Sequence, residues 1–211
     1  MTIKALIFDI GGVLFLPKGK ISESKNLLSS YKELCLLFKG INMSGEEFWE
    51  KSREVYLKST KGEITKKQQL EALSKILCLP PNKIDKIFVK ILKANIIENK
   101  LLIRYLVTLK RKGYRLGILS IQQHLSKEVL IPKKYYNLFN SMVISCDDKI
   151  RKPEPESYFL SLNKIGVKPE EALFIDDKPE NLDAAEKLGI NTLIFKNNKQ
   201  FFKELKKFNR R

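Results

Sequence analysis

The sequence predicts an α/β protein: a doubly wound parallel (Rossmann-like) sheet core with an inserted α-helical cap. Beyond about residue 100, short apolar runs typical of strands alternate with amphipathic segments typical of helices, which is the pattern of a parallel sheet covered by helices. Residues 21–93 instead carry apolar side chains at three- and four-residue spacings without a strong strand signal, so they predict helices alone. The expected division is a core of residues 1–16 and 94–211 and a cap of residues 17–93.

The first predicted strand, residues 3–8, leads into Asp9 and a turn at Gly11-Gly12. A short apolar run that ends in Asp and two glycines indicates a buried strand followed by a sharp turn. Groups just beyond the carboxyl end of such a strand line the ligand crevice of an open α/β sheet. Asp9 is therefore either a covalent nucleophile or a turn-forming residue.

The helical insert carries recognisable helix boundaries. Ser44 and Thr65 are expected N-caps, and Pro80-Pro81 is expected to close one helix before the next begins. Phe48 and Trp49 are interpreted as core residues of the insert, and contact with substrate is the alternative for these aromatic side chains.

After the insert, helices and strands alternate. The pattern predicts helices over 101–112, 155–165 and 181–188, strands over 114–119, 142–145, 172–175 and 192–195, and a frayed basic helix end over 203–211. Two of these strands end in polar residues, Ser120 and the pair Asp176-Asp177. These side chains and Asp9 are expected to converge on one crevice.

The adjacent carboxylates of Asp176 and Asp177 repel each other unless a cation offsets them. Mg²⁺ prefers oxygen ligands and commonly joins one or two carboxylates to a substrate phosphate, so these acids and Asp9 predict a magnesium site. The alternative for the pair is a capping or turn role. Lys152 is restrained by Pro153, and an ammonium held there would keep a nucleophilic carboxylate ionised.

Two further candidates follow the strand that ends at Ser120. The Ser120 hydroxyl and the Ile121 amide could hold an anion, or Ser120 could simply cap a helix. His124 is the only histidine; it is either an acid–base group or a histidine that is exposed or faces a helix.

The formal net charge of +16 comes from Lys spread along helical segments, without Arg clusters. A solvated, Lys-rich surface is the expectation, and nucleic-acid binding is the alternative. Cys35, Cys78 and Cys146 form no C-x-x-C pair, so they are interpreted as buried or free thiols in a reducing cytoplasm. No run approaches the roughly 18 apolar residues of a membrane span, and no secretory leader is expected.

Several segments together are recognisable. Residues 151–159 and 166–189 look very like the third and fourth motifs of a known hydrolase superfamily, Asp9 with residues 11–14 matches the first motif, and Ser120 matches the second. The helical insert is similar in placement to that family's α-helical cap. The chain thus resembles the haloacid dehalogenase superfamily of hydrolases over essentially its whole length.

The resemblance implies a Mg²⁺-dependent phosphatase of a small phosphorylated metabolite. Asp9 would attack phosphorus and form an aspartyl-phosphate, which water would release. Mg²⁺ would be held by Asp9, the backbone carbonyl of Gly11 and Asp177, with Asp176 as a ligand or an outer partner.

The resemblance also implies the phosphate contacts. Lys152, Ser120 and the amide of Ile121 would hold phosphoryl oxygens. Asn181 would orient the loop or Lys152 without itself touching the metal or the phosphate.

Two departures from the family pattern bear on activity. Gly11 replaces the Asp that usually acts as general acid and base, a function worth roughly 10²–10⁴-fold, and Ile121 replaces a usual polar residue. Loss of that Asp implies a slow enzyme, a good leaving group or another proton carrier, although glycine at this place also resembles glucose-1-phosphate-type phosphatases.

Two alternatives stay open. A metal-independent 2-haloacid dehalogenase would also lack the second Asp, but it would have no use for the Asp176-Asp177 pair. A non-catalytic binding or regulatory protein could keep the fold without the acid–base step.

Overall fold

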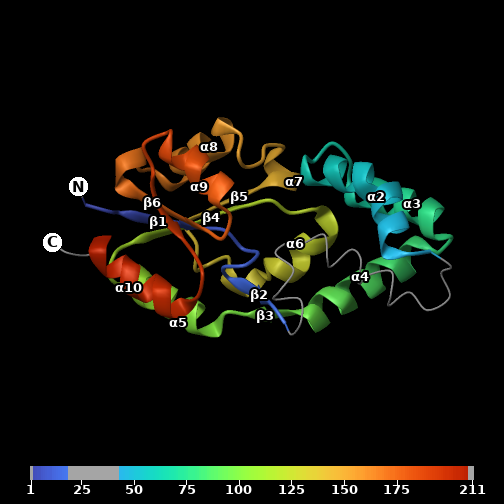
Figure 1. Cartoon of the computed structure of the whole chain (residues 1–211), viewed down its shortest axis with the longest axis horizontal. Coiled ribbons are helices and arrows are strands. Elements are labelled where there is room, and N and C mark those ends of the chain that lie inside the picture. The colour runs from blue at the N-terminus through green and yellow to red at the C-terminus, as the bar shows by residue number, and fades with distance from the viewer. Residues whose placement is uncertain (1, 19–42, 209–211) are drawn as a thin grey trace.

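The computed structural model describes residues 2–18 and 43–208, which form a parallel sheet covered by helices on both faces and a group of helices at one end (Figure 1). The sheet order is β5-β4-β1-β6-β7, and every neighbouring pair is parallel. The prediction of a doubly wound sheet is confirmed. The strands are β1 (Ala5–Phe8), β4 (Arg115–Ser120), β5 (Ser141–Ile144), β6 (Ala172–Asp176) and β7 (Asn191–Ile194).

Both faces of the sheet are buried. Leu6 and Phe8 of β1 pack into the cluster that includes residues of α5 (Lys100–Arg111) and α10 (Asn198–Phe208). Ala5 and Ile7 pack into the cluster with α8 (Pro155–Ile165) and α9 (Pro179–Glu186). Because helices cover both faces, the strand is a continuous apolar run rather than an alternating one.

The C-terminal tail differs from its prediction. Residues 203–208, expected as a frayed basic end, belong to α10, and Phe201 and Leu205 of that helix are buried in the core. The many lysines of this segment indicate a solvated end, but they lie on the outer face of the helix, opposite its apolar side chains. Residues 209–211 lie outside the described part.

The insert is helical where it is described, with α2 (Gly45–Thr60), α3 (Lys66–Leu77) and α4 (Pro81–Asn95). Ser44 accepts a hydrogen bond from the Glu47 amide, and Thr65 forms a capping box with Gln68, so both predicted N-caps are confirmed. Pro81 opens α4 instead of standing before it. The part of the predicted helical run over residues 21–42 lies outside the described residues.

The insert has its own hydrophobic core. Phe48 is buried there, Trp49 packs against its edge, and Leu125 of α6 (His124–Leu130) joins it from the sheet side. The rings of Trp49 and Tyr56 lie 5.7 Å apart. The interpretation as a core residue is confirmed for Phe48, whereas Trp49 is half-buried at the edge of this core.

A two-stranded antiparallel ribbon, absent from the sequence prediction, joins the insert to the core. It pairs β2 (Phe15–Pro17) with β3 (Ile96–Glu98). Asn99, next to β3, donates from its side-chain amide to the Val13 carbonyl at 3.0 Å. Three-residue strands are too short to show a periodicity. The exact division into core and cap at residues 17–93 stays a prediction.

Smaller elements complete the fold. Ser145, predicted as the end of a strand, instead begins the short helix α7 (Ser145–Asp148), and 3₁₀ turns cover Lys133–Tyr135 and Pro169–Glu171. Along the described residues no helix is both long enough and apolar enough to cross a bilayer.

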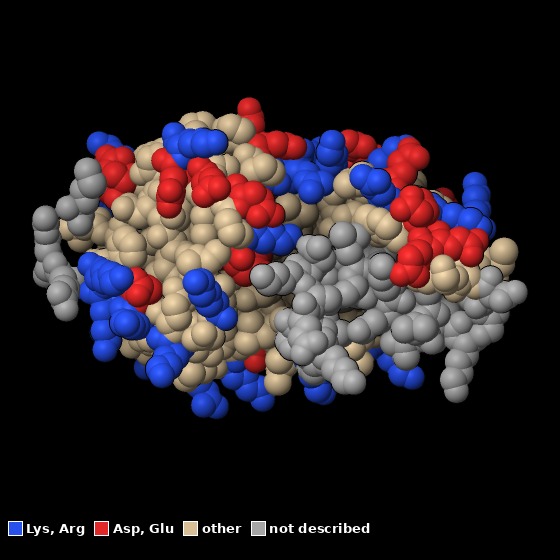
Figure 2. Space-filling model, viewed as in Figure 1, with Lys and Arg blue, Asp and Glu red and all other residues tan. Residues whose placement is uncertain are grey.

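The positive charge is distributed. On the face in Figure 2, Lys and Arg side chains lie in several small groups spread over the visible surface, many of them beside acidic side chains. Several lysines of the insert pair locally, as Lys58 does with Glu54 at 2.6 Å. This pattern is typical of a solvated Lys-rich surface, where such pairs each contribute about 1 kcal/mol or less.

Candidate active site

Asp9 lies at the switch point of the sheet. It directly follows β1, the central strand, whose neighbours β4 and β6 belong to chain segments that run to opposite sides. Its amide donates to the Ile175 carbonyl at 2.9 Å, and the residue is 8% exposed. Crevices that bind ligands form at this place in doubly wound sheets.

Lys152 is the buried cation of the site. It is 1% exposed, and its Nζ lies 2.9 Å from Asp9 Oδ1 and 2.5 Å from Asp176 Oδ2. It lies just before α8, and its Nζ is 5.3 Å from the centroid of the Phe174 ring. The fold therefore joins three residues that are far apart in the sequence.

Asp176 has partners on both carboxylate oxygens. Oδ1 accepts from the Lys178 amide at 2.8 Å, and Oδ2 accepts from Asn181 Nδ2 at 3.1 Å as well as from Lys152. Tyr158 donates its hydroxyl to the Asn181 carbonyl at 2.8 Å. Among the described contacts, Asn181 is therefore linked to Lys152 through Asp176, and its orienting role stays a prediction.

Asp177 is the acid of this site that has a carboxylate oxygen available for a further ligand. Its buried Oδ1 has no hydrogen-bond partner among the described residues. Carboxylate oxygens of Asp9, Asp176 and Asp177 all lie within 4.8 Å of one another. A buried, unpartnered oxygen beside two other carboxylates is a position that a cation would stabilise.

Gly12 allows Asp177 to approach the first turn. Its φ is +78°, and a Cβ built there would lie 2.3 Å from Asp177 Oδ2. Gly11, the residue expected to offer a backbone carbonyl, is half-buried and bridges to Phe15. The Gly11-Gly12 pair predicts a turn, but the close contact with Asp177 that favours glycine at residue 12 is visible only in the fold.

The charges at the site do not balance. Burial raises the pKa of Asp9; Lys152 lowers it and Asp176 raises it, and the net direction is upward. Burial lowers the pKa of Lys152, but Asp9 and Asp176 more than offset this and raise it overall. Burial, and then the charges of Asp9 and Asp176, raise the pKa of Asp177 to about 7. Three carboxylates around one ammonium leave an excess of negative charge.

Ser120 ends β4 and is buried. Gln122 Nε2 donates to Ser120 Oγ at 3.1 Å, and Ser126 donates to Gln122 Oε1 at 2.8 Å. Ile121 brings no polar side chain, as its sequence predicts, but Gln122 next to it supplies a polar contact that the sequence analysis missed. A glutamine after a strand gives no sequence signal of its own.

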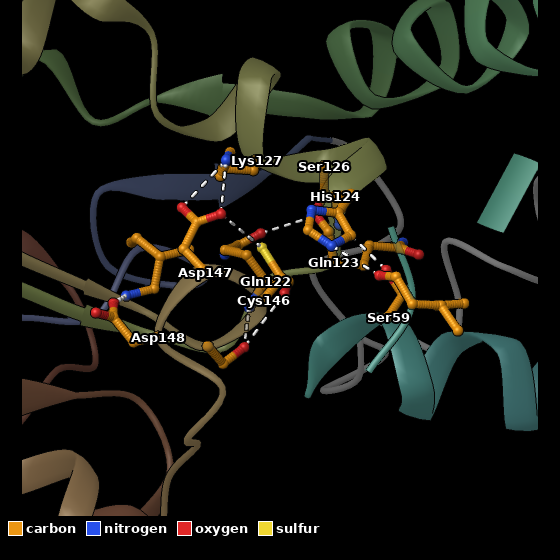
Figure 3. Close-up of polar contacts among 12 residues, drawn as sticks. Ser59, Gln122, Gln123, His124, Ser126, Lys127, Cys146, Asp147 and Asp148 are labelled. Atoms are coloured by element: carbon orange, nitrogen blue, oxygen red, sulfur yellow. Dashed lines mark hydrogen bonds and ion pairs between the residues drawn. The ribbon is translucent and has the colours of Figure 1, made fainter. Parts of the chain in front are cut away.

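A second buried contact joins this loop to the insert. Gln69 of α3 donates to Gln123 Oε1 at 2.6 Å and accepts from Ser59 of α2 at 2.8 Å. The His124 amide donates to Ser59 Oγ at 3.2 Å, and its Nε2 lies 2.9 Å from the Ile64 carbonyl. His124 therefore faces the insert, and within the described part of the chain its hydrogen bonds go to Ser59 and Ile64 rather than to Asp9, Asp176 or Asp177. Figure 3 shows Ser59, Gln123 and His124 together.

Comparison with known proteins gives a family match over most of the chain. A model of the haloacid dehalogenase-like hydrolases matches residues 3–189. Acyl-CoA dehydrogenase family member 10 of Mus musculus is 29% identical over 199 residues, which cover 90% of this chain and 18% of that protein. Bifunctional epoxide hydrolase 2 of the same species is 28% identical over 224 residues, covering 98% of this chain and 39% of that protein. The chain thus spans well under half the length of both relatives.

A shorter match and two solved structures complete the comparison. Glyceraldehyde 3-phosphate phosphatase of Methanopyrus kandleri is 29% identical over 99 residues, covering 44% of this chain and 41% of that one. A predicted HAD-like family hydrolase from Porphyromonas gingivalis superposes with a TM-score of 0.78 at 23% identity over 100% of both chains. The magnesium complex of a HAD family enzyme from Bacteroides thetaiotaomicron gives 0.73 at 24% identity over 97% of this chain and 99% of that one. The structural matches establish the fold.

Proposed function

The chain belongs to the haloacid dehalogenase-like hydrolases, and from this premise we propose that it is a Mg²⁺-dependent phosphatase of a small phosphorylated metabolite. The observation that carries the proposal is that Asp9 and Asp177 follow the carboxyl ends of β1 and β6, while Lys152, from the segment before α8, places its Nζ 2.9 Å from Asp9. A nucleophilic carboxylate, a buried ammonium and a carboxylate free to bind a cation are the parts that phosphoryl transfer through an enzyme aspartate requires.

The donor set fits magnesium. All candidate ligand atoms are oxygens, the buried Asp177 Oδ1 has no hydrogen-bond partner among the described residues, and the carboxylates outnumber the ammonium. We assign Asp9, the Gly11 carbonyl and Asp177 as ligands. Asp176, with both oxygens engaged, is the outer partner that positions Lys152. When bound, Mg²⁺ would neutralise negative charge on the phosphoryl oxygens.

The reaction has two steps. Asp9 attacks phosphorus, so that a bond from its carboxylate oxygen to phosphorus forms while the bond to the leaving oxygen breaks. Water then attacks the aspartyl-phosphate, releases phosphate and restores the carboxylate. Lys152 stabilises the phosphoryl charge, and the Ser120 hydroxyl and the Ile121 amide hold the remaining oxygens.

Proton transfer to the leaving group sets the substrate preference. With Gly11 where an acid usually stands, a leaving oxygen of low pKa departs without help, whereas an alkoxide must be protonated. Positioned acid–base catalysis contributes about 10²–10⁴-fold. Glyceraldehyde 3-phosphate phosphatase, one of the relatives, and a magnesium complex among the similar folds support the substrate class and the cofactor.

A panel of phosphorylated metabolites, assayed with Mg²⁺ and with EDTA, tests the proposal. We expect phosphate release that requires Mg²⁺, and faster turnover of an aryl phosphate than of simple alkyl phosphates, because the aryl leaving group needs no proton. Halide release from 2-haloacids in EDTA would replace the phosphatase by a dehalogenase. Metal binding without any turnover across the panel would indicate a binding protein.

The Gly12→Ala variant is expected to lose Mg²⁺ affinity. Its Cβ would overlap Asp177 Oδ2 and displace that ligand, and the left-handed φ adds about 1–2 kcal/mol of strain. Isothermal titration with Mg²⁺ measures the affinity, and urea unfolding measures the strain.

Gly113→Ala is the matched control for this variant. Gly113 has a φ of +90° with nothing within 4 Å of a built Cβ. The same strain without the contact should lower stability and leave Mg²⁺ affinity unchanged. Equal Mg²⁺ affinities in the two variants would contradict the assignment of Asp177 as a ligand.

A further inference from the structure

We propose that His124, Cys146 and Asp147 form a second metal site, which takes a borderline divalent cation such as Zn²⁺ and is separate from the carboxylate site. Donor atoms of these three side chains lie within 4.8 Å of one another. None of the three belongs to the set that the proposed phosphatase reaction uses. The site and its surroundings are drawn in Figure 3.

The spacing is close to that of a tetrahedral site. Zinc bonds of about 2.0–2.3 Å place ligand atoms roughly 3.3–3.8 Å apart. Cys146 Sγ lies 3.9 Å from Asp147 Oδ1. The Cys146–Asp147 pair is thus already near this spacing, and the His124 donor, within 4.8 Å of both, would have to move closer by up to about 1–1.5 Å.

The histidine is oriented for metal binding. The Ile64 carbonyl can only accept a hydrogen bond, so His124 Nε2 at 2.9 Å carries the proton and donates it. This leaves the lone pair of Nδ1 for a cation. Metal-binding histidines commonly donate their other ring N–H to a backbone carbonyl or a carboxylate, which fixes the tautomer and the ring orientation.

The site combines burial with access. Cys146 is 3% exposed, while Asp147 is exposed, so an ion can enter from the surface at the carboxylate. The ligands come from the starts of α6 and α7, which follow β4 and β5. Ile64 lies in the segment between α2 and α3. An ion that fixes the His124 ring would therefore stabilise its hydrogen bond to Ile64, which joins the insert to the core.

The ligand types select the metal. Imidazole nitrogen and thiolate sulfur suit Zn²⁺ and Co²⁺ and disfavour Mg²⁺. On binding, the Cys146 thiol loses its proton to solvent and the sulfur–metal bond forms, so no oxidant or reductant is needed. With three protein ligands, a fourth position is left for water.

Lys127 competes with the cation. Its Nζ lies 2.8 Å from Asp147 Oδ1 and 3.1 Å from Oδ2. An ammonium at this carboxylate repels a divalent ion and occupies its oxygens. Removing the charge of Lys127 should therefore tighten binding, whereas removing a ligand should weaken it.

A titration with Co²⁺ in excess Mg²⁺ tests the site. Thiolate–Co²⁺ bonds give a charge-transfer absorption band that carboxylate ligands cannot produce. Cys35→Ala and Cys78→Ala are introduced first, so that Cys146 is the only thiol. We expect the band to saturate at one equivalent and to disappear on addition of Zn²⁺.

Variants in that background separate the site from a structural effect. Cys146→Ala should abolish the band, His124→Ala should weaken Co²⁺ binding by at least about 10–100-fold, and Lys127→Met should strengthen it. Circular dichroism and thermal unfolding report whether each variant folds. Absence of the band while Cys146 is present, or a band that survives in folded Cys146→Ala, would overturn the proposal. Unchanged affinity in folded His124→Ala would do the same.

Discussion

Asp9→Asn is expected to abolish phosphatase turnover. The amide keeps the size of the side chain but cannot attack phosphorus, so the covalent step is lost. The decrease should exceed the roughly 10²–10⁴-fold that acid–base catalysis contributes. Phosphate release at saturating Mg²⁺ measures it. Asp183→Asn, an exposed carboxylate on α9, is the matched control and should keep full turnover.

A trapping experiment makes the same prediction sharper. Acid quenching of the wild-type protein with a radiolabelled phosphate ester should leave label on the chain, and Asp9→Asn should leave none. Turnover at the wild-type rate in Asp9→Asn, or label that persists in this variant, would refute Asp9 as the nucleophile.

Lys152→Met is expected to lower the free energy of unfolding by about 3–5 kcal/mol, the usual cost of removing one partner of a buried ion pair. The methionine fills the space, but Asp9 and Asp176 would then face each other without the ammonium that contacts both. Urea unfolding at neutral pH without Mg²⁺ measures the change. Turnover should fall as well, because the phosphoryl charge loses its buried partner.

Two variants control this prediction. Lys164→Met removes a surface pair in which Nζ lies 2.6 Å from Asp148, and should cost about 1 kcal/mol or less. Adding Asp176→Asn to Lys152→Met should recover part of the loss, since one of the two uncompensated carboxylates is removed. Strictly additive costs in the double variant would contradict a shared buried network.

The general architecture and the acidic site could be predicted because both follow from local patterns. Apolar runs that end in Asp9 and Asp176-Asp177 indicate strand ends, and parallel strands bring those ends together. The functional position of Lys152 is indicated by the proline that follows it and by the motif of residues 151–159. Each of these signals lies within a few residues of the group it identifies.

Other features depend on partners far along the chain, and no local pattern reveals them. A side chain at residue 12 would overlap Asp177. Gln123 is hydrogen-bonded to Gln69, and His124 is hydrogen-bonded to the Ile64 carbonyl. The β2–β3 ribbon escaped prediction for the same reason, since each strand is short and its pairing is visible only in the fold.

That ribbon makes the insert a modular part of the protein. Pro17 and Ile96 are paired across it, so the chain leaves the core and returns to it at one place. A tight turn joining these two residues would turn the ribbon into an ordinary hairpin, with β1 and Asp9 undisturbed. The chain path therefore permits changes of length in the intervening segment, while the packing of Leu125 against the insert and the Gln69–Gln123 hydrogen bond restrict which changes keep the core intact.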